Sequence, residues 1–231
     1  MNAPARTKEA LAERLLDALP QTQCTRCGYP DCAAYAQALS LEEAEIHQCP
    51  PGGAEGIVRL ADITGQAVKP LNPTFGIESP RTIAFIDEAW CIGCTLCIDA
   101  CPTDAIFGSN KRMHTVIEAY CTGCELCLPV CPVDCIALEP AHPTTQSDAP
   151  TGWSAWSPTL ADTARSRYEK AKQRRAATQS AHEAAQAAKA QHKLSDLAAH
   201  SRITDTNVLD QKKAVIQAAM ERARQRKALE P

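Results

Sequence analysis

The sequence shows neither a membrane-spanning segment nor a signal peptide. No window approaches the twenty or so consecutive apolar residues of a transmembrane helix, and the N-terminal stretch MNAPARTKEALAERLL places charged residues before any apolar run develops. We therefore expect the chain to stay in a reducing compartment. Thiols there are more often metal ligands or catalytic groups than disulfides.

Two further absences exclude common classes of enzyme. The sequence has no glycine fingerprint that would hold the phosphates of a nucleotide or flavin. Its six histidines show no order that pairs them with a serine or cysteine nucleophile. We therefore predict no catalytic residues, and any redox chemistry should belong to bound cofactors.

Cysteine, by contrast, is abundant, with thirteen residues in a chain of 231. Eight of them form two identical runs, Cys91-x2-Cys94-x2-Cys97-x3-Cys101-Pro102 and Cys121-x2-Cys124-x2-Cys127-x3-Cys131-Pro132. This spacing is typical of a chain wrapped around paired [4Fe-4S] clusters, in which the last cysteine of each run ligates the other cluster. The predicted ligand sets are therefore Cys91, Cys94, Cys97 and Cys131 for one cluster and Cys121, Cys124, Cys127 and Cys101 for the second.

A second motif lies near the N-terminus, Cys24-x2-Cys27-Gly28-Tyr29-Pro30-x-Cys32, followed by Cys49-Pro50. Four thiols at these gaps make one complete site, with Gly28 permitting a tight turn and Pro30 fixing the chain beyond it. Three near thiolates and one remote thiolate suit a cubane cluster, but a four-cysteine zinc site could use the same ligands. Zinc is less suited to the two longer runs, because a zinc ribbon uses well separated pairs of cysteines.

Together these motifs resemble the RnfB family, the B component of the bacterial Rnf (Rsx) electron transport complex. The resemblance covers Leu11 to about Pro140 and includes Asn72-Pro73-x-Phe75-Gly76 and Met113-His114-Thr115-Val116. It implies a [4Fe-4S] cluster on Cys24, Cys27, Cys32 and Cys49, and a role in passing electrons within a membrane complex that couples redox chemistry to ion movement. Typical members begin with a hydrophobic membrane helix, whereas this sequence begins at an amphipathic stretch, so we expect attachment to the membrane only through partner subunits.

We predict an α+β protein in five parts. These are a mostly helical N-terminal 4Fe-4S domain (1–60), a linker (61–80), a ferredoxin domain with two clusters (81–140), a linker (141–158) and a charged, alanine-rich helical tail (159–231). The connector after Pro50 contains glycine and proline, and its composition fits either a flexible hinge or a packed segment.

Hydrophobic periodicity predicts helices over 7–19, 33–46 and 54–64, and the composition of the tail predicts two more, over 158–200 and 208–229. Short strands are predicted at 82–86, 106–107, 114–118 and 136–138. Within the ferredoxin domain, Pro102-Thr103-Asp104-Ala105-Ile106 matches Pro132-Val133-Asp134-Cys135-Ile136 at an offset of thirty, which predicts a pseudo-twofold repeat.

Several residues outside the ligand sets have plain structural interpretations. Cys135 aligns with Ala105 in the repeat, so it is predicted to be a buried thiol that acts as a small hydrophobic residue. His114 is predicted to be a packing residue, since the thiolate sets are already full. Trp153 and Trp156 are predicted to cap a hydrophobic edge of the ferredoxin domain rather than to anchor a partner.

The charge distribution suggests the kinds of partner. Residues 1–80 hold 6 basic and 10 acidic side chains, residues 81–140 hold 3 and 8, and residues 141–231 hold 15 and 9. The acidic part should favour a positively charged redox partner by steering. The basic tail lacks a reading motif and a stacking platform for nucleic acid, so docking on membrane subunits or on an anionic lipid surface is favoured instead.

Three hypotheses follow. The favoured one is an electron-carrier protein with three [4Fe-4S] clusters, peripheral on the cytoplasmic face of the inner membrane, whose partners are the other subunits of an Rnf-type complex. The second is an independent soluble ferredoxin that serves cytosolic reductases. The third is a cluster-based redox sensor whose basic arm would bind nucleic acid in a salt-dependent way.

Overall fold

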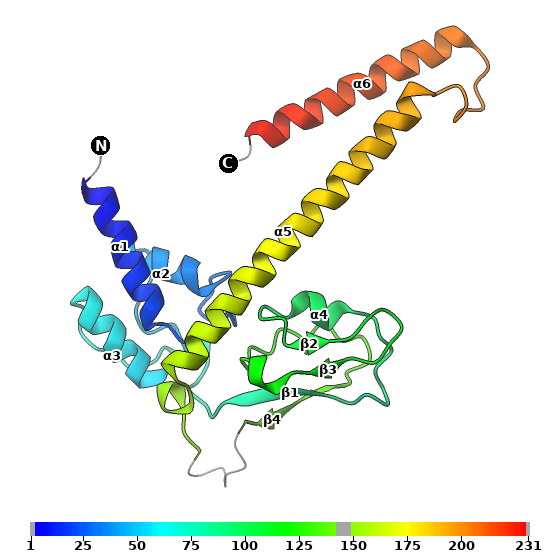
Figure 1. Ribbon diagram of the computed structural model, residues 1–231. Helices are drawn as coiled ribbons and strands as arrows, with labels where there is room; N and C mark the ends of the chain where they lie inside the picture. The colour runs from blue at the N-terminus through cyan, green and yellow to red at the C-terminus, as the bar shows by residue number, and fades with distance from the viewer. Residues whose placement is uncertain (1–2, 142–148, 230–231) are drawn as a thin grey trace. The chain divides into compact units, whose positions relative to one another are not determined.

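The computed structural model describes residues 3–141 and 149–229, and it divides into two compact units, Met1–Lys172 and Gln173–Pro231. The first unit contains every cysteine. Figure 1 shows its helical N-terminal part beside a part built from short strands.

Three helices form the N-terminal part: α1 (Ala3–Ala18), α2 (Cys32–Ser40) and α3 (Gly53–Thr64). Their apolar faces meet in one core, as the periodicity predicted. Its largest members are Leu15, Leu19, Tyr35, Leu39, Ile46, Ile57 and Leu60, all almost completely buried. Cys27, Cys32 and Cys49 belong to the same core, so the thiols lie inside the packed centre of this domain.

Helix α2 ends earlier than predicted. Asp31 caps its start by accepting a hydrogen bond from the Ala34 N–H at 2.7 Å. At its end the N–H groups of Leu41, Glu42 and Glu43 turn back onto carbonyls of the last turn, and Glu42 adopts a φ of 61°. A residue in this left-handed conformation stops the helix, so the prediction of a helix to Ile46 was wrong.

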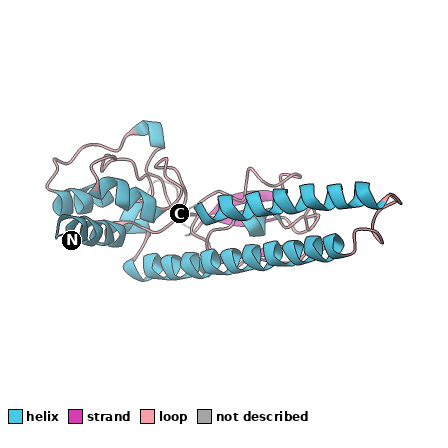
Figure 2. Ribbon diagram, turned by 90° about the horizontal axis from the view of Figure 1, so that it is seen from above, coloured by secondary structure: helices cyan, strands magenta, loops and turns pink. Residues whose placement is uncertain are grey.

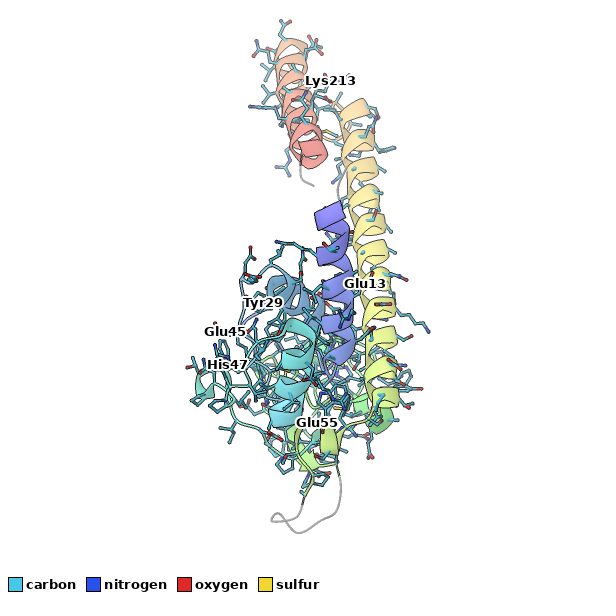
Figure 3. All side chains as sticks on the ribbon, turned by 90° about the vertical axis from the view of Figure 1, so that its left-hand side faces the viewer. Glu13, Tyr29, Glu45, His47, Glu55 and Lys213 are labelled. Carbon is cyan, nitrogen blue, oxygen red and sulfur yellow. The ribbon has the colours of Figure 1, made fainter. Side chains whose placement is uncertain are left out.

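The connector after α3 packs against the N-terminal domain, so the alternative of a flexible hinge is not what the structure shows. Leu71 contacts the core, and the Asn72 N–H donates to the His47 carbonyl at 3.0 Å. Lys69 forms an ion pair with Glu45 at 2.6 Å. Figure 3 shows Glu45 and His47 on the same side of this domain as Tyr29, whose hydroxyl donates to the Glu43 carbonyl at 3.4 Å.

The ferredoxin part contains two small antiparallel sheets, the magenta segments of Figure 2. Strand β1 (Thr82–Ile86) pairs with β4 (Ile136–Pro140), and β2 (Ile106–Phe107) pairs with β3 (Thr115–Val116). The strand positions were predicted correctly, although β3 is shorter than expected because the 3-10 turn Glu118–Tyr120 follows it. The helix α4 (Leu96–Ala100) completes this mixed architecture of helices and small sheets.

The two tryptophans lie against the first unit, but the prediction that both cap the ferredoxin part was wrong for Trp153, which packs on α3 of the N-terminal domain. The turn Gly152–Ala155 buries Trp153 under the Arg59 guanidinium, 4.0 Å from the ring centre. The Arg81 guanidinium lies 4.6 Å from the centre of Trp156. Residues 142–148 of the predicted linker lie outside the described residues.

Helix α5 (Pro158–Ser195) begins within the first unit, where Ala161, Ala164 and Ala171 are buried. The rest of α5 and helix α6 (Thr206–Leu229) form the second unit. Both helices were predicted, and both are poor in large aliphatic residues, consistent with their mostly exposed side chains. Among the helices that the structure describes, none combines the length and the apolar content required to cross a bilayer.

Candidate metal centres

The four N-terminal thiols, Cys24, Cys27, Cys32 and Cys49, lie together in the core of the first domain, and all are buried. Burial, together with the neighbouring Cys24 and Cys27 thiolates, raises the pKa of Cys32 to about 12. Burial raises the pKa of Cys49 well above its usual value, with Cys24, Cys32 and Cys27 adding to the effect. Four thiols that repel each other as anions need a positively charged occupant to be stable as thiolates.

The backbone around these thiols is tightly folded. Gln21, Gln23 and Thr25 have φ values of 60°, 56° and 59°, and Gly28 has a φ of 86°. Positive φ is uncommon for glutamine and threonine. Here positive φ occurs at every second residue, and alternation of positive and negative φ turns successive N–H groups to one side, as in anion-binding nests. The N–H of Tyr29 donates to the Cys27 sulfur, which supports a thiolate there. Gly28 makes the predicted tight turn.

Two buried glutamines complete this loop. The Cys32 N–H donates to the Gln23 side-chain oxygen at 2.9 Å, and the Gln23 amide donates to Gln21 at 3.3 Å. Gln21 in turn donates to the carbonyls of Leu16 and Leu19 at the end of α1. These glutamines were not predicted as part of the site, because neither their residue type nor their position in the sequence signals burial.

The second set joins the two cysteine runs. Burial raises the pKa of Cys124 and of Cys127 to about 12, and in both cases the Cys101 and Cys121 thiolates add to the effect. Cys101, from the end of the first run, therefore lies with the three near thiols of the second run. Backbone donors support these sulfurs, since the Ala105 N–H lies 3.2 Å from the Cys101 Sγ and the Ala84 N–H lies 3.4 Å from the Cys121 Sγ.

The third set is built from the near thiols of the first run. Burial raises the pKa of Cys97 to about 11, followed by the effect of the Cys94 and Cys91 thiolates. The remote member, Cys131, is linked to this group through Cys135. The Cys135 Sγ lies 3.5 Å from the Cys131 Sγ and also forms a hydrogen bond with Cys91.

His114 is buried against the third set. Its Nδ1 lies 3.3 Å from the Cys97 Sγ, and its backbone N–H lies 3.4 Å from the Cys91 Sγ. A Cβ on Gly108 would overlap the His114 ring, so only glycine lets the imidazole sit there. The prediction that Cys135 is buried was wrong, because it is only half-buried. The predictions of plain packing roles for Cys135 and His114 were also incomplete, because both contact thiols of the third set.

The N-terminal domain contacts the ferredoxin part beside the second set. The Thr122 hydroxyl, next to Cys121, donates to the Thr22 carbonyl at 2.9 Å. Arg26, next to Cys27, forms an ion pair with Glu125, next to Cys124, at 2.5 Å. The first thiol set therefore has the second set, rather than the third, as its neighbour across this contact.

The beginning of α5 strengthens this arrangement by contacting both parts of the first unit. Arg167 donates to the carbonyls of Thr103 and Asp104 at 2.7 and 2.9 Å, and its guanidinium lies 3.5 Å from the centre of the Tyr120 ring. One residue further on, the Tyr168 hydroxyl donates to Asp31 at 2.9 Å. Asp31 precedes Cys32, so one helical turn holds segments that lead into the first and second sets.

Among residues 3–141 and 149–229, no three histidine, cysteine or carboxylate side chains come together as a site for a single metal ion. The candidate donors are instead thiols, and backbone N–H groups donate to the sulfurs of Cys27, Cys91, Cys101 and Cys121. Soft thiolates with N–H donors to sulfur are the chemistry by which proteins hold iron–sulfur clusters, so the residues present fit such a group.

Comparisons with known proteins agree with this chemistry. A family described as "4Fe-4S dicluster domain" matches residues 84–138, and one described as "Putative Fe-S cluster" matches residues 19–51.

Three curated relatives are each named as the B component of an ion-translocating oxidoreductase complex. The protein of Azoarcus sp. is 58% identical over 139 residues, which cover 60% of this chain and 76% of the relative. That of Thiobacillus denitrificans is 58% identical over 107 residues, 46% of this chain and 57% of the relative. That of Serratia proteamaculans is 51% identical over 138 residues, 60% of this chain and 72% of the relative.

Proposed function

The chain belongs to the family of B components of ion-translocating oxidoreductase complexes, and from this premise we propose that it passes electrons through three [4Fe-4S] clusters within an Rnf-type membrane complex. The observation that supports the proposal most is that thiols gather near one another, with Cys24, Cys27, Cys32 and Cys49 in one group and Cys101 beside Cys121, Cys124 and Cys127 in another. When bound, such clusters accept and release single electrons. The protein itself is an iron–sulfur electron-transfer subunit.

We assign the ligands from this grouping and from the resemblance. The first cluster is held by Cys24, Cys27, Cys32 and Cys49. The second is held by Cys101, Cys121, Cys124 and Cys127, and the third by Cys91, Cys94, Cys97 and Cys131. Matching backbone conformations support a pseudo-twofold repeat for the last two, since Gly93 and Gly123 have φ values of 68° and 67°, and Thr95 and Glu125 have 69° and 67°.

We propose the following domain organisation: a first-cluster domain over 1–60, a connector over 61–80, the two-cluster ferredoxin domain over 81–140, a linker over 141–158 and a tail over 159–231. The contacts of Thr22 with Thr122 and of Arg26 with Glu125 support an electron path that runs from the first cluster to the second and then to the third. The connector packs on the N-terminal domain, and together with these two contacts it leads us to propose a path of fixed geometry.

The chain's own residues position and tune the clusters. Backbone N–H groups donate to the sulfurs of Cys27, Cys101, Cys121 and Cys91, and donors to sulfur stabilise the reduced, more negative state. Burial of eight of the twelve thiols limits access of water to the sites. Arg26, Arg165 and Arg167 hold the segments around the thiols in place through ion pairs and carbonyl contacts.

The partners we propose are the other subunits of the complex, with the chain peripheral on the cytoplasmic face of the inner membrane. The test is purification of the tagged full chain, without oxygen, from cells that contain the other subunits. We expect those subunits to be recovered with it from the membrane fraction. Recovery of the chain alone would favour an independent electron carrier for reductases instead.

Cys135 offers a test of tuning by a single side chain. Replacing Cys135 with alanine, the residue at the equivalent position 105 of the repeat, should leave all iron bound because Cys135 is not a ligand. It should lower the reduction potential of one ferredoxin cluster, since the loss removes a thiol that lies 3.5 Å from the Cys131 sulfur and can donate its single S–H to it.

The measurement is a redox titration followed by low-temperature paramagnetic resonance. The matched control is Cys135→Ser, which keeps a donor at this position and should restore most of the potential. If Cys135→Ala and the parent have the same potentials, the thiol only fills space.

A further inference from the structure

The two cysteine loops of the ferredoxin part face different surroundings. In the second run, Thr122 is only 6% exposed because it bonds to Thr22 of the N-terminal domain, and Glu125 pairs with Arg26 of that same domain. At the offset of thirty, Thr122 corresponds to Ile92, which is 58% exposed. One loop of the repeat is thus covered by an iron–sulfur domain, and the equivalent loop is open.

The exposed side chains of the open loop are apolar, and the segment before β3, which packs against this loop, adds another exposed apolar side chain. Leu96 is 46% exposed at the start of α4, and Met113 is 58% exposed in the segment before β3. The two segments pack together, because the Lys111 N–H donates to the Gly93 carbonyl at 2.9 Å and a Cβ on Gly93 would lie 2.5 Å from the Arg112 backbone. We call Ile92, Leu96, Lys111, Arg112 and Met113 the open surface.

This surface lies directly over the third thiol set. Ile92 follows Cys91, and Leu96 precedes Cys97. Met113 precedes His114, which contacts the sulfurs of both cysteines. A protein that docked on the open surface would therefore approach the third cluster by a short path.

The charge on the open surface differs from that of the rest of the ferredoxin part. Lys111 and Arg112 are two of only three basic residues between 81 and 140, and both are exposed. In the part of the chain that the structure describes, neither forms a salt bridge. The nearest carboxylate along α4 is Asp99, three residues beyond Leu96, so the positive charge is concentrated in the 111–112 segment.

We infer that the open surface is the docking site for a separate redox protein whose contact face is apolar and carries carboxylates opposite Lys111 and Arg112. This inference rests on the proposed function. At physiological salt, charges more than about 10 Å away are largely screened. Once a partner is in contact with the open surface, Lys111 and Arg112 therefore act on it more strongly than the acidic residues elsewhere in the ferredoxin part. One electron passes between the partner's cofactor and the third cluster, so that one is oxidised as the other is reduced, and no bond or proton changes.

The test uses the full chain with its clusters, reduced without oxygen, and two oxidised acceptors followed by stopped-flow absorbance. One acceptor is an acidic flavodoxin, and the other is a basic cytochrome c. The variants are Lys111→Glu with Arg112→Glu, and Ile92→Thr with Leu96→Gln, where threonine is the residue that the second run carries. The matched control is Lys189→Glu with Lys193→Glu, which makes the same change of net charge on α5.

We expect the charge reversal at 111 and 112 to lower the second-order rate constant for flavodoxin by about tenfold or more at low salt, while cytochrome c reacts as fast as before or faster. The apolar pair of substitutions should slow flavodoxin at both low and high salt. The control pair should change the flavodoxin rate less than about twofold, since it makes the same change of net charge outside the open surface, and every variant should keep the parent's iron content and resonance spectrum.

Flavodoxin rates that are the same for the parent and both open-surface variants would overturn the docking site while leaving the proposed function intact. So would a slowing by the control pair as large as that by Lys111→Glu with Arg112→Glu. A self-associated parent that Leu96→Gln converts to monomer, seen by sedimentation, would assign the surface to a second copy of this chain. If the parent itself takes up no electrons, the proposed function fails first.

Discussion

Replacing Cys101 with alanine is expected to remove one cluster and to unfold the ferredoxin part. Cys101 comes from the first run but lies with Cys121, Cys124 and Cys127 of the second, so its loss removes a link between the two halves. A core of about sixty residues supplies only about 3–5 kcal/mol of net stability, and metal ligation must supply the rest. Loss of the Cys101 ligand should therefore lower the free energy of unfolding of the ferredoxin part by at least about 3–5 kcal/mol.

The measurement combines iron analysis with hydrogen exchange of residues 81–140. We expect iron to fall from about twelve to about eight or fewer per chain, and the amides of β1 and β4 to lose most of their protection. Cys135→Ala is the matched control, since it removes a neighbouring thiol from the same part and should keep all the iron. A Cys101→Ala protein with the parent's iron content and thermal midpoint would show that the crossed ligand assignment is wrong.

Replacing Cys49 with alanine is expected to act on the other domain alone. Cys49 lies in the core shared by α1, α2 and α3, and helices of 16, 9 and 12 residues are too short to be stable without that core. The variant should lose about four irons of the expected twelve and should become sensitive to proteases across residues 3–76. The ferredoxin part should keep its two clusters, because none of the ligands that we propose for them comes from this domain.

Limited proteolysis with mass spectrometry, together with iron analysis, measures this separation. Ser40→Ala is a suitable control, because it changes a buried residue of the same domain that contributes no thiol. Loss of all iron, or cleavage that begins between β1 and β4, would mean that the two domains do not hold their clusters independently.

Much of the candidate site could be predicted from the sequence because cysteine spacing is a local property. Three thiols at intervals of three residues must lie close together whatever the rest of the chain does. The short strands were also predictable, since β1 and β4 alternate or run apolar beside each cysteine loop. The family resemblance, based on motifs around Cys24 and Cys91, agreed with the relatives found by comparison.

What could not be predicted depends on contacts between residues distant in the sequence. The pairing of Arg26 with Glu125 joins residues that no periodicity relates. Arg167 reaches the carbonyls beside Asp104 from a helix whose composition suggested only a solvated tail. The left-handed conformation of Glu42, which ends α2, is also invisible because glutamate rarely adopts it.

Cys135 shows where alignment within the repeat misled the interpretation. Its counterpart Ala105 is buried and apolar, so a plain packing role was a reasonable prediction. The N–H of Ala105 lies 3.2 Å from the Cys101 sulfur, and the equivalent position in the repeat brings the Cys135 sulfur within 3.5 Å of the Cys131 sulfur. A repeat thus predicts where a residue lies better than it predicts what a different side chain does there.

The most direct test of the central claim is the content of iron, sulfide and zinc in the full chain purified without oxygen. Three clusters on twelve cysteines require about twelve irons and about twelve sulfides per chain, together with a paramagnetic signal at low temperature after reduction. About eight irons with one zinc would indicate that the N-terminal thiols bind zinc instead of a cluster. A colourless protein with neither iron nor such a signal would contradict the account as a whole.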